Sequence, residues 1–256
     1  MKLATWNVNS LKVRLPHVLH WLAAAQPDAL ALQETKLTDD QFPAEAFAEA
    51  GYRSVFAGQK AYNGVALLSR AEAREVLTDL PGLPDPDRRI LAATLGDVRV
   101  LNLYVVNGQE VGSERYAYKL QWLARVAGHV RSELTRYPRL AVVGDFNIAP
   151  EDRDVYDAEA YREHIHCSTP EREALQGLLA VGLVDCFRRF EQPEKSFSWW
   201  DYRQGAFRRN MGLRIDLILA SGALARGCTA CTIDRGPRKL ERPSDHTPVV
   251  ATFADD

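Results

Sequence analysis

The sequence predicts a mixed α/β fold with sheets inside and helices outside. Ten short runs rich in Val, Ile, Leu and aromatic residues are typical of β-strands. Several of these runs are apolar on both faces, which indicates strands that are covered on both sides. The predicted strands are 2–8, 29–33, 52–57, 64–69, 90–95, 98–106, 140–144, 196–200, 213–220 and 248–253.

Apolar residues with helical spacing lie between some of these strands. The first pattern runs over 15–22 and the longest over 120–134, while the third covers 175–179 and follows Thr169-Pro170, a helix-start signal. We therefore expect three or four helices. The opening strand carries Asn-x-Asn and strand 140–144 precedes Asp-x-Asn, which hints at two duplicated halves.

Length and composition favour an ordinary globular enzyme. The chain has 256 residues, 46% hydrophobic and 26% charged, with a formal net charge of −2. A domain of this length buries roughly 70–75% of its unfolded surface, and no low-complexity linker divides the sequence. We expect one domain over 1–256 and a monomer. No apolar stretch reaches the roughly 20 residues needed to cross a bilayer, so we expect no membrane contact and a cytoplasmic location.

Cysteine usage predicts neither disulfides nor a zinc site. Four cysteines in 256 residues are few for an exported disulfide scaffold. Cys228 and Cys231 have C-x-x-C spacing, but strand-like neighbours predict that their sulfurs point to opposite faces. His164, His166 and Cys167 lack a nearby fourth ligand, so we expect structural or surface roles for these histidines.

The net charge conceals a basic stretch. Between 203 and 242 there are nine Lys or Arg residues and three acidic ones, a local charge of +6, so the remaining chain carries −8. A basic face on an otherwise acidic protein suits a polyanion such as nucleic acid. Solvated arginines on a loop would give the same pattern.

Polar residues follow or interrupt the apolar strands at five places. A buried, unpaired carboxylate costs several kcal/mol, which convergence of these residues on one cleft would avoid. As isolated residues they would suit turns and helix caps equally well. They are Asn7 and Asn9, Glu34, Asp145 and Asn147, Asp216, and Asp245 with His246.

These residue types favour metal-assisted phosphodiester hydrolysis. Glu34, Asp245 and the amide of Asn7 offer the oxygen ligands that Mg²⁺ or Mn²⁺ prefers. Asp216 would orient His246 and keep it protonated beside a negative substrate.

A water and an oxyanion would complete this chemistry. Asp145 could accept a proton from water, and the amide of Asn147 could donate to a developing oxyanion. Tyr104, in strand 98–106, offers a phenol that ordinary sheet packing would also explain.

Eight segments in order resemble the exonuclease III-like apurinic/apyrimidinic endonucleases of the endonuclease/exonuclease/phosphatase superfamily. They are TWNVNS, LQETK, GQKAYNGVALLS, LNLYVVNG, GDFNIAP, FSWWDYR, GLRIDLILAS and ERPSDHTPV. The resemblance implies a four-layer α/β/β/α sandwich of the DNase I-like type, with two mixed sheets face to face and helices outside. It also implies Mg²⁺-dependent DNA repair on double-stranded DNA. Cleavage 5' to an abasic site would leave a 3'-hydroxyl and a 5'-deoxyribose phosphate, with 3'–5' exonuclease or 3'-phosphatase activity as side reactions.

The resemblance also implies site roles. Asn7, Glu34 and Asp245 match the metal site, with Asp145 and Asn147 as a second metal position. Asp145 matches the residue that activates water, Asn147 its phosphate-binding neighbour, Asp216 and His246 the Asp–His pair, and Tyr104 the phenol near the phosphate. Trp199, Leu213 and Ile215 match the pocket for the flipped sugar, where sheet core is the alternative interpretation. Asn107, Arg208 and Arg209 are the predicted DNA contacts.

One departure from the family pattern, the identity of the base and two alternative functions stay open. Asn9 stands where some relatives have an aspartate, which leaves the number of charged metal ligands open. Whether Asp145 or His246 is the base is also open. The alternative functions are a catalytically inactive nucleic-acid-binding relative and a phosphoesterase of the same fold with a non-DNA substrate.

Overall fold

The computed structural model describes residues 1–81 and 87–254, which contain two six-stranded sheets and six α-helices. The first sheet consists of β1 (Lys2–Asn7), β2 (Ala29–Gln33), β3 (Arg53–Ala57), β4 (Val65–Ser69), β11 (Cys228–Ile233) and β12 (Val249–Phe253). The second consists of β5 (Ala73–Leu77), β6 (Ile90–Leu95), β7 (Val98–Tyr104), β8 (Leu140–Asp145), β9 (Leu183–Asp185) and β10 (Asp216–Ser221). The helices are α1 (Leu11–Ala25), α2 (Ala44–Glu49), α3 (Glu114–Arg136), α4 (Thr169–Leu179), α5 (Ala206–Arg209) and α6 (Gly222–Arg226).

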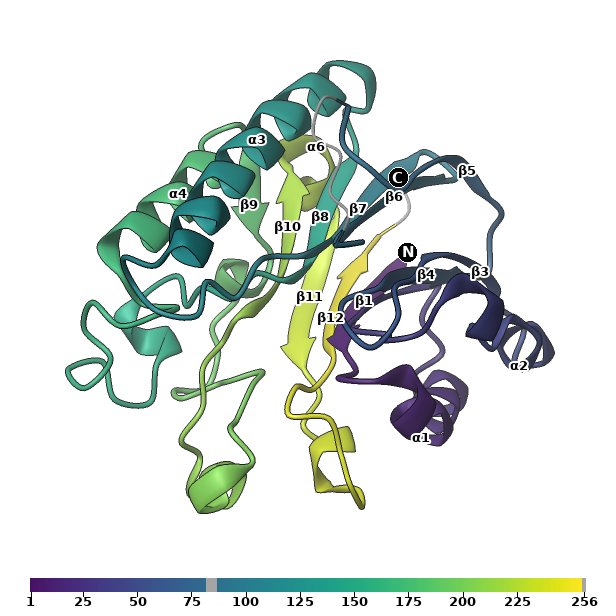
Figure 1. The fold of residues 1–256 in the computed structure, drawn as a ribbon. Helices are drawn as coiled ribbons and strands as arrows, with labels where there is room; N and C mark the ends of the chain where they lie inside the picture. The colour runs from purple at the N-terminus through teal and green to yellow at the C-terminus, as the bar shows by residue number, and fades with distance from the viewer. Residues whose placement is uncertain (82–86, 255–256) are drawn as a thin grey trace.

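The sheets face each other, with helices on their outer sides (Figure 1). Between the sheets lies an apolar core to which both contribute, for example Leu67 from β4 and Val143 from β8. A second core joins α3 and α4 to the second sheet through residues such as Trp122. A third core joins α1 and α2 to the first sheet through residues such as Trp21 and Phe47. The predicted four-layer sandwich is therefore confirmed.

The two sheets have the same order and directions of strands, but β6 and β7 are consecutive in the chain whereas their counterparts β12 and β1 are its last and first strands. The strand orders of the sheets are β11-β12-β1-β2-β4-β3 and β5-β6-β7-β8-β10-β9. In each sheet the central pair is parallel, β1 with β2 and β7 with β8, and a helix, α1 or α3, connects the two strands. The suggested duplication therefore holds for the order and directions of the strands, but the correspondence differs from the predicted one. By position in the strand order, β1, which ends at Asn7, corresponds to β7, which ends at Tyr104. Likewise β8, which ends at Asp145, corresponds to β2, which ends at Gln33.

Some predicted elements were wrong. Residues 196–200 form no regular strand, only an isolated bridge at Trp199 that pairs with Leu213 and His246. Cys228 and Cys231 lie in β11 as expected, but both are buried in the core between the sheets, because a register shift after Cys228 interrupts the two-residue alternation. All four cysteines are free thiols.

Other elements were missed because they are short. Strands β5 and β9 and the helices α2, α5 and α6 have between three and six residues, which is too few to show a clear periodicity. Among the residues that the structure describes, no helix is long and apolar enough to cross a membrane.

Candidate active site

Strand register in the second sheet brings three predicted site residues into one row. Asp145, the last residue of β8, is paired with Tyr104 at the end of β7 and with Asp216 at the start of β10. Gly144 precedes Asp145 with φ +142°, and a Cβ at this position would lie 1.9 Å from the carbonyl oxygen of Leu103. Only glycine fits so close to the neighbouring strand, so the backbone that carries Asp145 depends on it.

The first sheet contributes the opposite wall of the site. Asn7 ends β1 and Glu34 follows β2, and the Asn7 amide donates to Glu34 Oε1 at 2.8 Å and to Asp145 Oδ2 at 2.9 Å. The carboxyl ends of strands from both sheets therefore meet at this point. Glu34 has φ +52° and Asn147 has φ +51°, an uncommon backbone conformation that recurs at functional sites.

Asp216 and His246 form the predicted pair. The imidazole Nδ1 donates to Asp216 Oδ2 at 2.9 Å, while Nε2 lies 3.7 Å from Asp145 Oδ2. Burial opposes a charge on the ring, but the carboxylates of Asp216 and Asp145 outweigh it and raise the pKa of His246 to about 10. The histidine is therefore a cation at neutral pH.

Asp145 is a buried carboxyl with a neutral-range pKa. Burial raises its pKa to about 7, with the His246 charge acting in the opposite direction. Its Oδ1 accepts a hydrogen bond from the backbone N–H of Asn147 at 2.9 Å. Burial and the charges of Glu34 and Asp145 also raise the pKa of the Tyr104 phenol, so this group remains protonated and can donate a hydrogen bond.

Asn147 and Asn107 adjoin this row. The Asn147 amide donates to the carbonyl of Val105 at 2.9 Å, and Asn107 Nδ2 donates to Asn147 Oδ1 at 3.3 Å. Asn147 is buried and Asn107 is exposed. The structure thus brings these two predicted residues together at the rim of the site.

Asp245 has different neighbours from those expected. Its Oδ1 accepts a hydrogen bond from Asn9 and its Oδ2 accepts one from Trp199 Nε1, both at 3.0 Å. Within the described ranges, Glu34, Asp145 and His246 form a group of three potential ligand residues, with one ligand atom of each within 4.8 Å of the other two. Asp245 is not part of this group, and its carboxylate binds Asn9 and Trp199 instead.

The donor set fits a hard divalent cation. Glu34 and Asp145 offer carboxylate oxygens, the ligand type of Mg²⁺ and Mn²⁺. His246 is a poor ligand here because a cationic imidazole has no free lone pair. Glu34 is also bound by Lys36, whose Nζ lies 2.9 Å from Oε2, so its carboxylate is already oriented by a cation.

Two of the residues predicted to line the sugar pocket are buried. Leu213 and Ile215 are 0% and 2% exposed and pack with Ala149, Val155 and Cys167. Trp199 packs against the same cluster, is only partly buried, and lines a cavity with Tyr156 and Tyr161. Leu213 and Ile215 are therefore part of a small buried core, on which the cavity-lining Trp199 rests.

The basic stretch is not one continuous face. Arg208 and Arg209 are exposed in α5, as expected for DNA contacts. Arg214 is instead 1% exposed and lies between Asp154 and Asp185, while Arg238 is buried against Trp200. Part of the local positive charge is therefore neutralised inside the protein.

Two side chains that contact the predicted site residues were not identified from the sequence. Lys36 lies in LQETK, two residues after Glu34, and its Nζ donates to Asn9 Oδ1 at 2.5 Å. Ser198 Oγ donates to Asp216 Oδ2 at 2.6 Å. The sequence did contain a signal for Lys36, because it is the basic residue of the LQETK motif. For Ser198 there was none, because its segment was predicted to be a strand.

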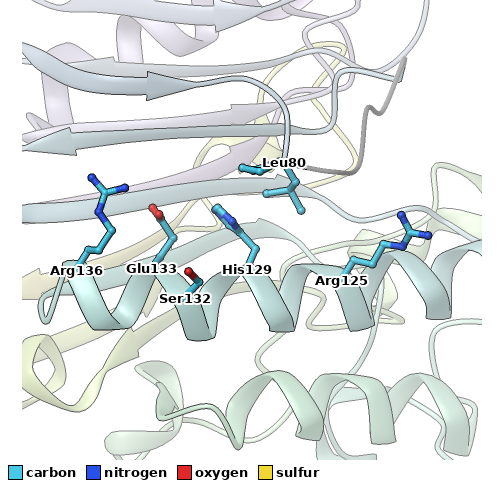
Figure 2. A pocket seen from close by; sticks show the side chains of 7 residues that line it. Leu80, Arg125, His129, Ser132, Glu133 and Arg136 are labelled. Atoms are coloured by element: carbon cyan, nitrogen blue, oxygen red, sulfur yellow. The ribbon is translucent and has the colours of Figure 1, made fainter.

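A separate cavity of about 530 Å³ lies along α3. Figure 2 shows the side chains that line it. It is lined by Leu80, Pro81, Arg125, His129, Ser132, Glu133 and Arg136. These seven residues include none of the predicted site residues. The cluster around Asp145 is therefore a distinct place in the molecule.

The fold and the site together define a class of protein, the hydrolases that use carboxylates, a metal ion and a His–Asp pair on phosphoesters. A model of the Endonuclease/Exonuclease/phosphatase family matches residues 4–246, and the chain belongs to this family. It is a hydrolytic nuclease of the exonuclease III and AP endonuclease type.

Individual relatives agree with this membership. The chain is 36% identical to the exodeoxyribonuclease III of Haemophilus influenzae, over 99% of this chain and all of the relative. The solved 3' phosphatase NExo from Neisseria, bound to a product DNA hairpin, is 50% identical with a TM-score of 0.98, and each chain is fully covered. An AP endonuclease structure from Archaeoglobus fulgidus is 39% identical with a TM-score of 0.95, again with both chains fully covered.

Proposed function

We propose that the chain is a Mg²⁺-dependent DNA repair nuclease that hydrolyses the phosphodiester 5' to an abasic site in double-stranded DNA. The products are a 3'-hydroxyl and a 5'-deoxyribose phosphate. One observation carries this proposal: the Asn7 amide links the carboxylates of Glu34 and Asp145, and Asp145 Oδ2 lies 3.7 Å from His246 Nε2. A proton acceptor and a fixed positive charge in one buried place suit the attack of water on a phosphoester.

The side chains divide the chemistry between them. Asp145 accepts the proton of the attacking water, because its buried carboxylate lies beside both Glu34 and His246, where the phosphate would bind. His246, kept protonated by Asp216, stabilises the charge that develops on the phosphate. Asn147 and the phenol of Tyr104 donate hydrogen bonds to phosphate oxygens.

Glu34 and Asp145 are the proposed metal ligands, with Asn7 beside them and Asp245 at the edge of the site. When bound, Mg²⁺ would polarise the phosphate and neutralise charge on its oxygens. Mn²⁺ has the same preference for oxygen ligands and is the alternative ion.

A second activity, on DNA 3' ends, is favoured by the Neisseria relatives. A 3' terminus would reach the phosphate site without the flipping that an abasic site within a duplex needs. The Neisseria relatives at 50% identity are a 3' phosphatase and a 3'–5' exonuclease. We therefore expect 3'-phosphate removal to be faster than abasic-site incision.

Three duplex substrates test the proposal. They contain an abasic-site analogue, a nick with a 3'-phosphate, and a recessed 3'-hydroxyl end, each incubated with Mg²⁺ or EDTA. We expect Mg²⁺-dependent products from all three and none with EDTA. If no substrate gives a metal-dependent product, the result supports a catalytically inactive nucleic-acid-binding relative. If the protein hydrolyses only a non-DNA phosphoester, the result supports a phosphoesterase of the same fold.

The remaining expectations belong to the same proposal. The chain would act as a monomer and as one domain over 1–256, in the cytoplasm. Arg208, Arg209 and Asn107 would contact the DNA backbone, because all three are exposed and either cationic or able to donate hydrogen bonds.

A further inference from the structure

A fully buried lysine lies directly beneath the site loops. Lys119 projects from α3, and its side chain is 0% exposed. Its ammonium donates to the carbonyl oxygens of Asn147 at 2.8 Å and Asn107 at 3.0 Å, and to Glu171 Oε1. An ammonium has three N–H groups, and here each has an acceptor.

Glu171, in α4, extends this connection. Its Oε1 also accepts from the backbone N–H of His166 at 3.1 Å, and its Oε2 accepts from Ser168 Oγ at 2.6 Å. His166 in turn donates from Nδ1 to the same Asn147 carbonyl at 2.7 Å. Two helices and three loops are therefore joined at one buried ion pair.

The joined loops carry the groups that face the phosphate site. Asn147 adopts φ +51°, which costs free energy unless surrounding contacts over-determine it. From this backbone its N–H donates to Asp145 Oδ1 and its amide lies beside Asn107. Close packing supports the same arrangement, because a Cβ on Gly108 would lie 3.1 Å from Lys119 Cδ.

We propose that Lys119 is a positioning residue for phosphoester hydrolysis: through the carbonyls of Asn147 and Asn107 it fixes the Asn147 amide relative to Asp145. This inference rests on the proposed function. In the proposed mechanism Lys119 contacts neither the attacking water nor the substrate, and it acts through Asn147. Burial of the Lys119–Glu171 pair would otherwise be unexpected, since such pairs contribute little net stability.

The test replaces the pair and not one partner. Lys119→Met alone would leave the Glu171 carboxylate buried and unpaired, which can unfold the protein. The double variant Lys119→Met/Glu171→Gln removes both charges at nearly constant volume. We expect kcat on a 3'-phosphate nick to fall about 10- to 100-fold, with KM changed less than about threefold and the secondary-structure spectrum unchanged.

A matched control separates positioning from general stability. Arg99 and Glu133 form a second buried pair at 2.7 Å, also anchored on α3 but outside the site. Arg99→Met/Glu133→Gln should destabilise the fold by a similar amount without lowering kcat. Equal kcat losses in both double variants would overturn the proposal.

A mutant cycle tests the route through Asn147. In an Asn147→Ala background, the Lys119→Met/Glu171→Gln change should alter kcat less than about threefold, because the positioned amide is already absent. Full additivity of the two effects would overturn the inference. If the wild-type protein itself has no metal-dependent activity, the proposed function has failed instead. Amide hydrogen exchange over 146–149 gives an independent readout, and we expect it to accelerate at least about tenfold in the pair variant.

Discussion

Asp216 and His246 form a fully buried pair, with Nδ1 of the ring donating to Oδ2 of the carboxylate at 2.9 Å. Ser198 Oγ donates to the same carboxylate oxygen at 2.6 Å, so the acid is fixed from two sides. The opposite ring nitrogen faces Asp145. This arrangement keeps a positive charge next to a carboxyl that titrates near neutral pH.

Asp216→Asn should reduce kcat by about 10²–10⁴-fold. The amide carries no charge, so the pKa of His246 falls and the ring no longer remains a cation over the working pH range. Steady-state rates on a 3'-phosphate nick between pH 6 and 9 check this. We expect the alkaline loss of activity to begin at lower pH in the variant, and an unchanged profile would contradict the assigned role.

Asp145→Asn should bind DNA but hydrolyse it poorly. The variant keeps the shape of the side chain and loses the proton acceptor, so we expect a fall in kcat of about 10²–10⁴-fold with the Kd for duplex DNA changed less than about threefold. Single-turnover kinetics and a binding titration in EDTA measure the two quantities separately. Retention of the wild-type rate would show that another group accepts the proton.

Glu34→Gln should weaken metal binding. Loss of one charged oxygen ligand is expected to raise the Mg²⁺ concentration for half-maximal activity by about tenfold or more. A Mg²⁺ titration of activity measures this shift, with Mn²⁺ binding as a check that does not depend on turnover. The control is Glu45→Gln, which changes an exposed glutamate in α2 and should leave the titration unaltered.

Protein stability should fall in mild acid through His166. Burial, with the nearby Lys119 charge, lowers the pKa of His166 to about 4. Between pH 6.5 and 4 the unfolded chain therefore binds more protons, so the free energy of unfolding decreases as the pH falls. From pH 7 to 5 we expect a loss of about 2 kcal/mol from this residue.

His166→Asn provides the comparison for that prediction. Asparagine tolerates the positive φ of 71° and retains an N–H donor for the Asn147 carbonyl, but does not titrate. Urea unfolding at pH 7 and pH 5 should show a smaller pH effect in the variant. The same pH effect in both proteins would assign it to other groups.

Asp154→Asn should strongly destabilise the fold. Asp154 is 0% exposed and accepts from Arg214 Nε at 2.6 Å and from Nη2 at 3.1 Å. Without this charge the buried Arg214 loses one of its two ionic contacts and keeps that with Asp185, and we expect a loss of about 3–5 kcal/mol. Thermal unfolding measures it. Glu159→Gln, in an exposed ion pair with Arg162, should leave the transition temperature unchanged, and an equal shift in both variants would be contrary to expectation.

Sequence patterns were sufficient for the layered α/β architecture. Continuous apolar runs such as 65–69 and 140–144 are typical of strands that are covered on both faces. The corresponding strands β4 and β8 are fully buried. Likewise, Asn7, Glu34 and Asp145 drew attention because a carboxylate or amide at the end of an apolar strand needs a partner. Those partners proved to be one another.

Tertiary structure alone decided which groups touch. The contact of Asp245 with Asn9 spans 236 residues, and the burial of Leu213 and Ile215 depends on side chains from the 149–167 segment. Lys119 looks like any helix-surface lysine in the sequence, yet it is enclosed by Asn107, Asn147 and Glu171. Local patterns encode the burial and periodicity of a segment, because these follow from its own side chains. Hydrogen-bond partners and pKa values depend on the distance between segments, and only the packed fold sets that distance.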